Sequence, residues 1–494
     1  MYRLLLYVLL VLAGVAEVLS FLKILPFDPI GLAISAGWLV FVCYVANKVF
    51  SYVFEAPTNL ESVYITALIL FLIISPTMRN FNDLAFMGWA GTLAIASKYI
   101  LAINKKHIFN PAAIAVALTA FAIGSSASWW VGTSSMFPFV LIGGLLIVKK
   151  IQRFDLFFSF LATSVIGTLL IVLQSGGNFI TTLQTLFISS SLLFFGFIML
   201  TEPLTTPPTR KLRMIYGALV GIIFIPNLHF GSIYSTPEIA LVIGNIFAYL
   251  VSPKQKLVMS LANKVQIAPD IMDFAFALPN AGFKFTPGQY MEWTLPHKSP
   301  DSRGNRRYFT IASSPTENNL LLGVKFYENG SSFKRNLKDL SPSGKIVGSQ
   351  LAGEFLLPKD PNKKYVFMAG GIGITPFRSM LKYLIDTNTK MNILVIFSNK
   401  IAADIVYKDV LDQSSANLGI KTYYTLTDEE NIPADWNGGR GRIDAKTISR
   451  IPYYKEAYYY LSGPHVMVKG FEQALSELGI PKTQIRKDFF PGFV

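Results

Sequence analysis

The first 252 residues are a succession of apolar runs, and this feature limits the possible folds more than any other. They hold only 13 of the chain's 44 Lys and Arg residues and 8 of its 30 Asp and Glu residues. Runs that approach the roughly 20 residues needed to cross a bilayer predict membrane-spanning helices. We count about ten such runs, at residues 3–25, 29–52, 62–78, 83–103, 110–131, 136–150, 154–174, 183–201, 212–229 and 233–252.

Basic residues are distributed unevenly among the loops between these runs. Loops after even-numbered runs carry eleven Lys and Arg residues, whereas loops after odd-numbered runs carry two, Lys23 and Arg79. Because cytoplasmic loops favour basic residues, we expect a protein integral to the cytoplasmic (inner) membrane, with both termini and the second half in the cytoplasm. The net charge of +14 is spread along the chain, so we expect the lipid bilayer as a partner and no nucleic acid.

The pattern changes at Ser252-Pro253, where the apolar runs stop. Short alternating stretches such as Tyr290–Leu295 predict antiparallel strands. After about residue 362, an apolar strand, a Gly-rich turn and an amphipathic helix follow one another, which is typical of a parallel α/β sheet. We find no internal repeat. The predicted fold is multi-domain: an α-helical transmembrane bundle of about ten spans (residues 1–252), a small β-barrel (253–360) and an α/β nucleotide-binding domain (361–494).

The chain has one cysteine, Cys43, and four histidines. A single cysteine excludes a disulfide and a Cys-ligated zinc or iron–sulfur site within the chain. Two stacked haems need four histidine ligands, and the first half has two, His107 and His229. We therefore expect no metal site and an organic cofactor for any electron chemistry.

The segment Arg307-Tyr308-Phe309-Thr310 ends a predicted barrel strand. Because side chains alternate along a strand, Arg307 and Phe309 share one face. There the arginine can bind a diphosphate and the aromatic ring can stack on a flavin, while Thr310 can hydrogen-bond the flavin edge. The alternative is an ordinary strand with a solvated arginine.

A second candidate phosphate site is Gly330-Ser331-Ser332, which precedes a predicted helix. Small residues let backbone N–H groups approach a phosphate at a helix start, where the helix dipole favours an anion. The alternative is a serine N-cap after a glycine turn, which is common.

Two turns follow predicted strands in the α/β part. Gly370–Pro376 lies between a strand and a helix, where glycines let the pyrophosphate of a dinucleotide approach the backbone. Ser462-Gly463-Pro464 ends another strand and can bring a nicotinamide close to a flavin, or it is simply a tight turn. The aromatic run Phe489–Val494 follows the last predicted strand. Such a run often packs in a hydrophobic core, and this is the alternative to a role at the cofactor.

The strand Ile393–Phe397 is followed by Ser398 and Lys400, with no acidic residue at its end. An acidic residue there would bind a ribose 2′-hydroxyl and repel a 2′-phosphate. We therefore favour NADPH over NADH, with Ser398 and Lys400 as phosphate ligands. The alternative is that Lys400 is a solvated loop lysine.

In order and spacing, these motifs resemble those of the ferredoxin–NADP reductase family over about residues 255–494. The resemblance implies bound FAD together with NADPH or NADH, and it implies that Phe490 or Phe493 shields the flavin. Two departures are Phe309 in the usual place of a tyrosine and Ser462 in the usual place of a cysteine. Our candidate catalytic residues are Thr310, Thr375 and Ser462.

Three stretches of the first half, Ser97–Tyr99, Lys106–Ala113 and Phe197–Pro203, carry a second resemblance. They are similar to the NqrB/RnfD family of membrane flavoproteins, whose members belong to the sodium-pumping NADH:quinone reductase and to the Rnf complex. This resemblance implies a flavin in the membrane. The usual Ser-Gly-Ala-Thr attachment motif is missing, so we expect non-covalent FMN or riboflavin rather than a covalent cofactor.

Asn110 and Glu202 are the candidate ligands in this half. Asn110 followed by Pro111 also predicts a helix N-cap, and Glu202 can alternatively reach water at a helix end. The complete set of candidate cofactor-binding residues is Arg307, Tyr308, Phe309, Thr310, Gly330, Ser331, Ser332, Gly370, Gly371, Gly373, Thr375, Pro376, Ser398, Lys400, Gly463, Pro464, Phe493, Asn110 and Glu202.

Together these features favour an FAD-dependent oxidoreductase that passes electrons from NAD(P)H to a membrane flavin, a quinone or a redox protein. FAD suits this role because it accepts two electrons and releases them singly. The alternatives are an ion transporter coupled to electron flow, a haem-type transmembrane reductase and a structural component of a larger complex. The sequence leaves the oligomeric state open.

Overall fold

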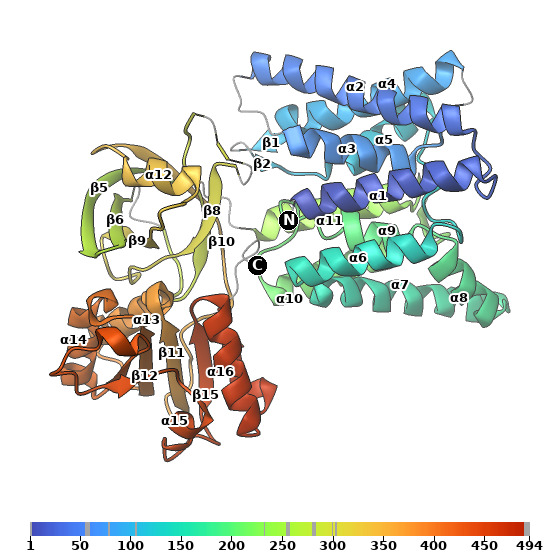
Figure 1. The fold of residues 1–494 in the computed structure, drawn as a ribbon. Helices are drawn as coiled ribbons and strands as arrows, with labels where there is room; N and C mark the ends of the chain where they lie inside the picture. The colour runs from blue at the N-terminus through green and yellow to red at the C-terminus, as the bar shows by residue number, and fades with distance from the viewer. Residues whose placement is uncertain are drawn as a thin grey trace. The chain divides into compact units, whose positions relative to one another are not determined.

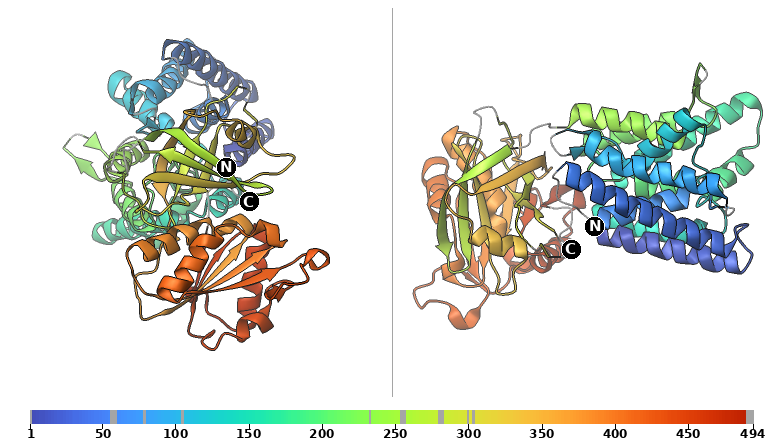
Figure 2. Two further views of the ribbon diagram at one scale, coloured as in Figure 1. Left: turned by 90° about the vertical axis from the view of Figure 1, so that its left-hand side faces the viewer. Right: turned by 90° about the horizontal axis from the view of Figure 1, so that it is seen from above.

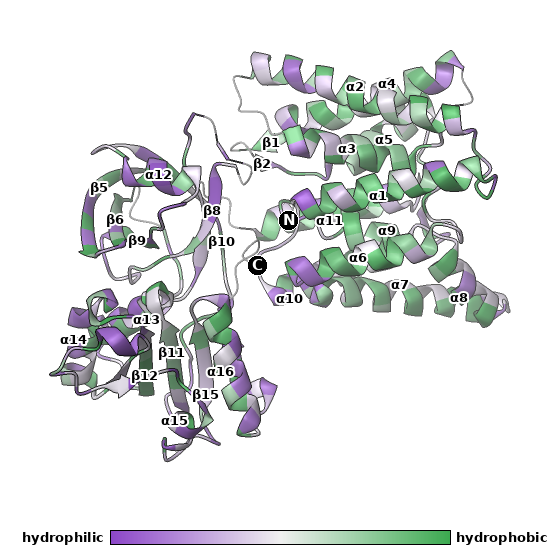
Figure 3. Cartoon of the chain, viewed as in Figure 1, coloured by the Kyte–Doolittle hydropathy of each residue, from purple (hydrophilic) through white to green (hydrophobic). Residues whose placement is uncertain are grey.

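The computed structural model describes residues 2–54, 60–77, 80–103, 106–231, 233–252, 257–278, 283–298, 300–301 and 304–488. It divides into two compact units, Met1–Lys254 and Gln255–Val494. The first unit is built mainly of helices, and the second contains two six-stranded sheets (Figure 1). Hydrophobic residues dominate most helices of the first unit, whereas the second unit shows a mixture of hydrophobic and hydrophilic residues (Figure 3).

Most helices of the first unit correspond to apolar runs of the sequence, and several are shorter than those runs. Where a cap is formed, a side chain of Asp, Asn or Thr accepts a backbone N–H at the helix start, as Asn110 does for the helix that begins at Pro111. The helices are α1 (Tyr2–Phe21), α2 (Pro29–Val53), α3 (Leu60–Ile73), α4 (Phe81–Ile100), α5 (Pro111–Ile123), α6 (Phe137–Ile151), α7 (Phe154–Ser175), α8 (Phe179–Ile188), α9 (Leu192–Phe194), the π-helix η1 (Phe195–Met199), α10 (Arg210–Ile223) and α11 (Pro237–Val251).

The structure corrects the expected count of about ten spans. Among the described residues, three helices are long and apolar enough to cross a membrane: Arg3–Phe21, Pro29–Val53 and Phe154–Ser175. A fourth is added if Phe179–Ile188 and Leu192–Met199, which are bent by 53°, form one span. Other apolar runs contain shorter helices, such as the 14-residue α3, which at 1.5 Å per residue is about 21 Å long.

Each half of the first unit ends in a two-stranded hairpin that is followed by a helix. In the first half, α1 to α4 lead to the hairpin of β1 (Ala102–Ile103) and β2 (Lys106–His107), and then to α5. In the second half, α6 to α10 lead to the hairpin of β3 (His229–Phe230) and β4 (Ile233–Tyr234), and then to α11. Corresponding helices pack alike, because α2 packs on α4 and α7 packs on α10. The two halves therefore share this part of their element order, although the number of helices before the hairpin differs between them.

Helices α7 and α10 approach each other through glycines. A Cβ on Gly217 would lie 2.7 Å from the carbonyl oxygen of Leu156, and one on Gly221 would lie 2.7 Å from that of Phe160. Such distances are too short for real Cβ atoms, so the two helices are in backbone contact. Small residues permit this packing in a bilayer, where apolar side chains alone drive little association.

The second unit begins with an antiparallel sheet in the order β8-β7-β10-β5-β6-β9. Its strands and a short helix between the last two of them in the chain enclose a core that contains Phe274, Phe276, Trp293 and Phe333. The elements are β5 (Leu257–Ala268), β6 (Ile271–Ala277), β7 (Tyr290–Thr294), β8 (Arg306–Thr310), β9 (Asn319–Lys325), α12 (Ser332–Lys338) and β10 (Lys345–Ala352).

The rest of the second unit is a parallel sheet in the order β14-β13-β12-β11-β15-β16, with helices on both faces (Figure 2). Because all its strands are parallel, their carboxyl ends meet at one edge, with β11 between β12 and β15. The elements are β11 (Lys364–Gly370), the 3₁₀ turn η2 (Gly371–Ile374), α13 (Thr375–Asp386), β12 (Asn392–Asn399), α14 (Lys408–Leu418), β13 (Lys421–Leu426), β14 (Gly439–Arg440), α15 (Ala445–Ser449), β15 (Tyr458–Ser462), α16 (His465–Glu477) and β16 (Ile485–Lys487).

A part-buried hydrogen bond joins β6 of the first sheet to the residue that precedes α14. Tyr407 Oη donates to Asp273 Oδ1 at 2.5 Å. Burial raises the pKa of Asp273 to about 6, and the hydrogen bond from Tyr407 opposes this shift. Burial and the neighbouring Asp273 also raise the pKa of Tyr407 well above its ordinary value. Tyr407 therefore stays protonated and acts as the hydrogen-bond donor.

Gly217→Ala should destabilise the helical unit, because the added methyl group must push α10 away from α7. Gly37→Ala is the matched control, since Gly37 lies in α2 and a Cβ there meets nothing within 4 Å. Alanine at position 37 should be neutral or stabilise by up to about 1 kcal/mol. Thermal unfolding in detergent should show a lower Tm for Gly217→Ala alone, and equal Tm values for the two variants would contradict the packing.

Asp273→Asn should improve stability more at pH 8 than at pH 5. The folded-state pKa of Asp273 lies above that of a free Asp, about 3.9, so the folded state binds the extra proton. Stability from this group is therefore complete below pH about 4 and is lost as the pH rises through about 6. Asparagine cannot ionise and avoids this loss. Differential scanning fluorimetry at both pH values checks the difference, with exposed Asp435→Asn as control; a pH-independent difference would refute it.

Candidate functional site

Arg307 on β8 is held against an acidic residue. Its Nη2 lies 3.2 Å from Asp301 Oδ1, and its Nη1 donates to the carbonyl oxygen of Gly304 at 2.9 Å. The guanidinium carbon lies 5.5 Å from the centre of the Phe333 ring. The side chain of Arg307 is 11% exposed, so it is not the solvated strand arginine of the alternative interpretation.

Ser332, the first residue of α12, contacts the same acidic residue. Ser332 N–H donates to Asp301 Oδ2 at 3.0 Å, and Ser332 Oγ accepts the backbone N–H of Asp301 at 2.9 Å. His297 Nε2 lies 3.0 Å from Ser332 Oγ. Ser331 is the N-cap of α12, because its Oγ accepts the N–H of Lys334 at 3.3 Å. The expected N-cap is therefore present beside the candidate phosphate-binding amide.

Arg307 and the Ser332 amide thus converge on the two oxygens of one carboxylate, that of Asp301. A carboxylate resembles a phosphate in charge and in hydrogen-bonding capacity, so Asp301 stands in for an anionic group. The donor set fits the diphosphate of a flavin dinucleotide. Sequence reasoning missed Asp301, and a carboxylate six residues before a candidate phosphate-binding arginine is the signal that could have found it.

The other residues of the β8 motif divide between the two faces of the strand. The Phe309 ring lies 5.9 Å from the Phe333 ring, so Phe309 and Arg307 share a face, as strand alternation predicts. The Tyr308 ring meets the Tyr290 ring edge-on at 5.8 Å. Thr310 is buried and pairs with Tyr290 across β7 and β8.

The two turns of the α/β domain lie against each other. A Cβ on Gly373 would lie 2.5 Å from Gly463 Cα, and one on Gly463 would lie 3.0 Å from Gly370 Cα. Gly371 has a φ of +51°, which favours glycine. The ends of β11 and β15 therefore meet at a distance that only glycines allow, although almost 90 residues separate the turns in the sequence.

The hydroxyl groups at these turns have protein partners. Thr375 starts α13, and its Oγ1 donates to the carbonyl oxygen of Ile372 at 3.1 Å. Ser462 Oγ donates to Asp488 Oδ2 at 3.1 Å. Pro376 is the second residue of α13 and Pro464 precedes α16. Sequence reasoning missed Asp488, which lies next to the terminal aromatic run; Phe490 and Phe493 lie outside the described residues.

The candidate 2′-phosphate ligands are placed differently from each other. Ser398 is buried, at 1% exposure, whereas the Lys400 side chain is 75% exposed. Lys400 Nζ lies 3.8 Å from Asp428 Oδ2, and Asp428 follows the end of β13. The neighbouring strand therefore supplies an acidic residue that sequence reasoning missed. Because Asp428 offsets the charge of Lys400, the absence of an acid after β12 no longer favours NADPH.

In the first unit, the carboxylate of Glu202 is surrounded by hydrogen-bond donors. Asn110 Nδ2 donates to Glu202 Oε2 at 3.0 Å, and Thr205 Oγ1 donates to the same oxygen at 3.2 Å. His107 Nε2 lies 3.3 Å from Glu202 Oε1. Both candidate ligands of the first half, Asn110 and Glu202, therefore belong to one polar cluster, which His107 and Thr205 complete.

Asn110 also connects this cluster to the last helix of the unit. Its Oδ1 accepts the N–H of Ala113, which confirms the predicted N-cap, and its own N–H donates to Asn245 Oδ1 at 2.7 Å. Asn245 Nδ2 donates to Tyr216 Oη at 3.1 Å. Asn245 was not singled out from sequence, although a fully buried asparagine in an apolar helix needs such partners.

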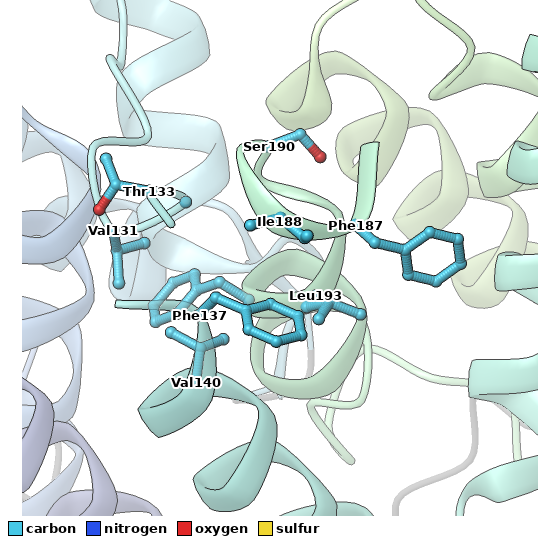
Figure 4. Close-up of a pocket in the computed structure, with 10 residues that line it drawn as sticks. Val131, Thr133, Phe137, Val140, Phe187, Ile188, Ser190 and Leu193 are labelled. Atoms are coloured by element: carbon cyan, nitrogen blue, oxygen red, sulfur yellow. The ribbon is translucent and has the colours of Figure 1, made fainter. Parts of the chain in front are cut away.

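The space beside these polar groups is small. A pocket lined by His107, Thr205 and Tyr249 has a volume of about 10 Å³, enough for about one water molecule. A second pocket of about 10 Å³ is lined mainly by apolar side chains, among them Phe137, Phe187 and Leu193 (Figure 4). The donors around Glu202 suit the polar edge of a flavin, but neither pocket fits an isoalloxazine ring.

Comparison with protein families identifies three regions of the chain. Residues 258–348 match the oxidoreductase FAD-binding domain, and residues 367–473 match the oxidoreductase NAD-binding domain. Residues 130–256 match the NQR2, RnfD, RnfE family. The two resemblances found in the sequence are therefore confirmed: a region of the NQR2, RnfD, RnfE family precedes FAD-binding and NAD-binding oxidoreductase domains in one chain.

Curated relatives match a little under half of the chain. The chain is 26% identical over 227 residues to the stachydrine N-demethylase reductase subunit Stc4 of Rhizobium meliloti, covering 45% of this chain and 63% of the relative. It is 27% identical over 233 residues to a flavohemoprotein of Bacillus cereus, covering 45% and 58%. NADH-cytochrome b5 reductase 1 of Mortierella alpina is 27% identical over 237 residues, covering 47% and 78%. The chain thus spans about six tenths of the length of the first two relatives.

Solved structures also match a little under half of the chain. The cytochrome b5 reductase domain of Ulva prolifera nitrate reductase has a TM-score of 0.43 and 21% identity, and the match covers 48% of this chain and 98% of that domain. Ferredoxin NADP⁺ reductase from Neisseria gonorrhoeae has a TM-score of 0.40 and 17% identity, covering 47% and 97%.

Substitutions of Lys400 and Asp428 should change kcat/KM for NADPH and for NADH differently if the two side chains face the adenosine ribose. Lys400→Ala should lower kcat/KM for NADPH about fivefold and spare NADH, since an exposed charge pair contributes up to about 1 kcal/mol. Asp428→Asn should raise kcat/KM for NADPH, because it removes repulsion of the 2′-phosphate. Steady-state kinetics with both nucleotides checks this, with Lys408→Ala, from another exposed Lys–Asp pair, as control. Equal effects on both nucleotides would exclude contact with the 2′ position.

Proposed function

We propose that this chain is a membrane-bound flavoprotein oxidoreductase that passes electrons from NAD(P)H through FAD to an acceptor in or at the membrane. Bound FAD supplies the essential chemistry, because it accepts an electron pair and releases electrons singly. The acceptor belongs to the class of quinones, flavins or redox proteins. The fused FAD-binding, NAD-binding and NQR2, RnfD, RnfE family regions support this proposal.

The observation that carries the proposal is the convergence of Arg307 and the Ser332 amide on the Asp301 carboxylate. We assign these donors, with the Gly330–Ser332 turn, to the FAD diphosphate. Phe309 shares the face of Arg307 and is assigned to the flavin ring, and Thr310 is assigned to the ring edge. This division uses the strand alternation that separates Arg307 and Phe309 from Tyr308.

The glycine contact between Gly370–Gly373 and Gly463 supports a nicotinamide-nucleotide site at this edge of the sheet. Backbone N–H groups at the start of α13 can hold the pyrophosphate, and the glycines allow it to approach. We assign the Thr375 and Ser462 hydroxyls to the reacting end of the nucleotide. Asp488 would orient Ser462 by accepting its hydroxyl proton in a hydrogen bond.

We propose residues 1–252 as the membrane domain, 253–360 as the FAD-binding domain and 361–494 as the NAD(P)-binding domain, the last two in the cytoplasm. In the membrane domain, the three long apolar helices would face lipid, while shorter buried helices such as α3 and α5 would lie inside the bundle. Irregular helices are tolerated at membrane depth when protein surrounds them. Asn110 and Glu202 would then contact the polar edge of the acceptor.

Coupling of electron flow to ion movement is the second candidate function. The observation that favours it is Glu238, a carboxylate with 2% exposure in the first turn of α11. Trp129 Nε1 donates to Glu238 Oε2 at 3.2 Å. Buried carboxylates in membrane helices often mark ion or proton paths. Electron transfer in sealed vesicles that leaves sodium and pH gradients unchanged would exclude this function.

Arg307→Ala should abolish most FAD binding, because it removes the charged donor assigned to the diphosphate. Arg306→Ala is the matched control, since Arg306 is the preceding residue and its side chain is 51% exposed. Detergent-purified protein should release about one FAD per chain on acid precipitation, from the wild type and the control alike. Full FAD content in Arg307→Ala would overturn the assigned site.

A further inference from the structure

The barrel and the α/β domain of the second unit meet beside both proposed cofactor segments. Helix α13 begins directly after the glycine loop, and its first turns contact residues 312–317, which follow β8. Ala312 is two residues beyond Thr310, and Arg378 is three residues beyond Thr375. The contact therefore connects the flavin strand to the nucleotide loop by a short path.

Arg378 makes three of the hydrogen bonds in this contact. Its Nη1 donates to the carbonyl oxygen of Ala312 at 3.2 Å. Its guanidinium also pairs with both carboxylate oxygens of Glu317, and Nη2 lies 2.8 Å from Oε1. The Arg378 side chain is 11% exposed. A bidentate pair that is largely removed from water fixes direction as well as distance, and a lysine cannot reproduce its geometry.

Neighbouring residues hold the same two segments together. Ser379 Oγ donates to the carbonyl oxygen of Ser313 at 2.6 Å, and both residues are buried. Glu317 Oε2 accepts the backbone N–H of Ser314 at 2.6 Å. Successive residues of α13 thus hold successive carbonyl groups of the segment after β8, and Glu317 stabilises the turn in that segment.

A second attachment lies beside the first, since the Arg378 guanidinium carbon lies 5.8 Å from the centre of the Tyr407 ring. A Cβ on Gly323 of β9 would lie 2.3 Å from Tyr407 Oη, 3.0 Å from Thr375 Cγ2 and 3.1 Å from Asp273 Oδ1. Glycine at this position therefore makes room for the Tyr407–Asp273 hydrogen bond and for Thr375. Tyr407 adopts a φ of +57°, which is rare for a tyrosine, and its contacts maintain that conformation.

The geometry of this contact bears on the reaction. Reacting atoms must lie about 3–3.5 Å apart, and a misplacement of about 1 Å can cost about 100-fold in rate. The flavin strand and the nucleotide loop belong to different sheets, so their separation depends on how α13 sits on the barrel. Arg378 contacts both the backbone after β8 and a carboxylate of that segment, which fixes the helix start in two directions.

We propose that Arg378 is a positioning residue that sets the nicotinamide against the flavin by fixing the start of α13 to the residues that follow β8. This inference rests on the proposed function. Arg378 touches neither proposed cofactor segment directly, so its removal should change the geometry between them rather than the affinity for either cofactor.

The test compares Arg378→Gln, Arg378→Lys and the control Lys364→Gln in the full-length protein. Lys364 forms an exposed ion pair with Glu456 within the α/β domain, away from the barrel. Anaerobic stopped-flow measurement of flavin bleaching by NADH and NADPH gives the limiting rate and the nucleotide Kd. Arg378→Gln should lower the limiting rate at least about tenfold, with FAD content and Kd within about twofold of the wild type. Arg378→Lys should have a limiting rate between those of Arg378→Gln and the wild type. The control Lys364→Gln should have the wild-type limiting rate.

Hydrogen exchange provides a readout that does not need flavin chemistry. Peptides that cover residues 312–317 and the start of α13 should exchange at least about tenfold faster in Arg378→Gln than in the control. A wild-type limiting rate in Arg378→Gln, or unchanged exchange, would overturn the proposal. A wild-type protein that contains no FAD would instead refute the proposed function, and the exchange comparison would still decide whether Arg378 fixes α13 to the barrel.

Discussion

At the carboxyl edge of the parallel sheet, two backbone segments approach so closely that no side chain fits between them. Gly373 packs on Gly463, and Gly463 packs on Gly370. This contact joins the turn after the central strand β11 to the turn after β15, directly before the start of α13. Because Arg378 and Ser379 lie in the first turns of α13, the attachment of the helix to the barrel also depends on it. The positions of the nucleotide loop and of the barrel therefore both depend on this glycine contact.

The glycine turns and the strand motif were predictable because their signal is local. A turn between a strand and a helix, or alternation along β8, is written in consecutive residues, and Arg307 and Phe309 lie on one face as expected. Asp428 and Asp488 were missed because each acts on a residue that another segment supplies, whereas Asp301 lies only six residues before Arg307 and joins it to the more distant Ser332. Nothing in the sequence beside Asp428 indicates that β13 ends next to Lys400.

In the helical unit, hydropathy predicted an apolar domain but not its span count. An apolar run shows only which residues are present, whereas a membrane span also needs an unbroken helix of sufficient length. Residue runs such as 110–131 contain a 13-residue helix and a following loop, and 183–201 contains a 53° bend. Asn110 and Glu202 were singled out from the sequence, but their contact with each other and with Asn245 was not, because these residues come from three separate parts of the chain.

The left-handed backbone of Tyr407 has a consequence for how the two domains of the second unit come apart. A tyrosine in this conformation stores conformational strain, of order 1–3 kcal/mol, that its buried side-chain contacts must exceed. Once the Oη–Asp273 bond breaks, relaxation of the backbone would move the tyrosine from its site, while Arg378 and Ser379 would still hold α13 to the segment after β8. The contact at Tyr407 should therefore be either formed or fully broken, rather than adjustable over a continuous range of angles.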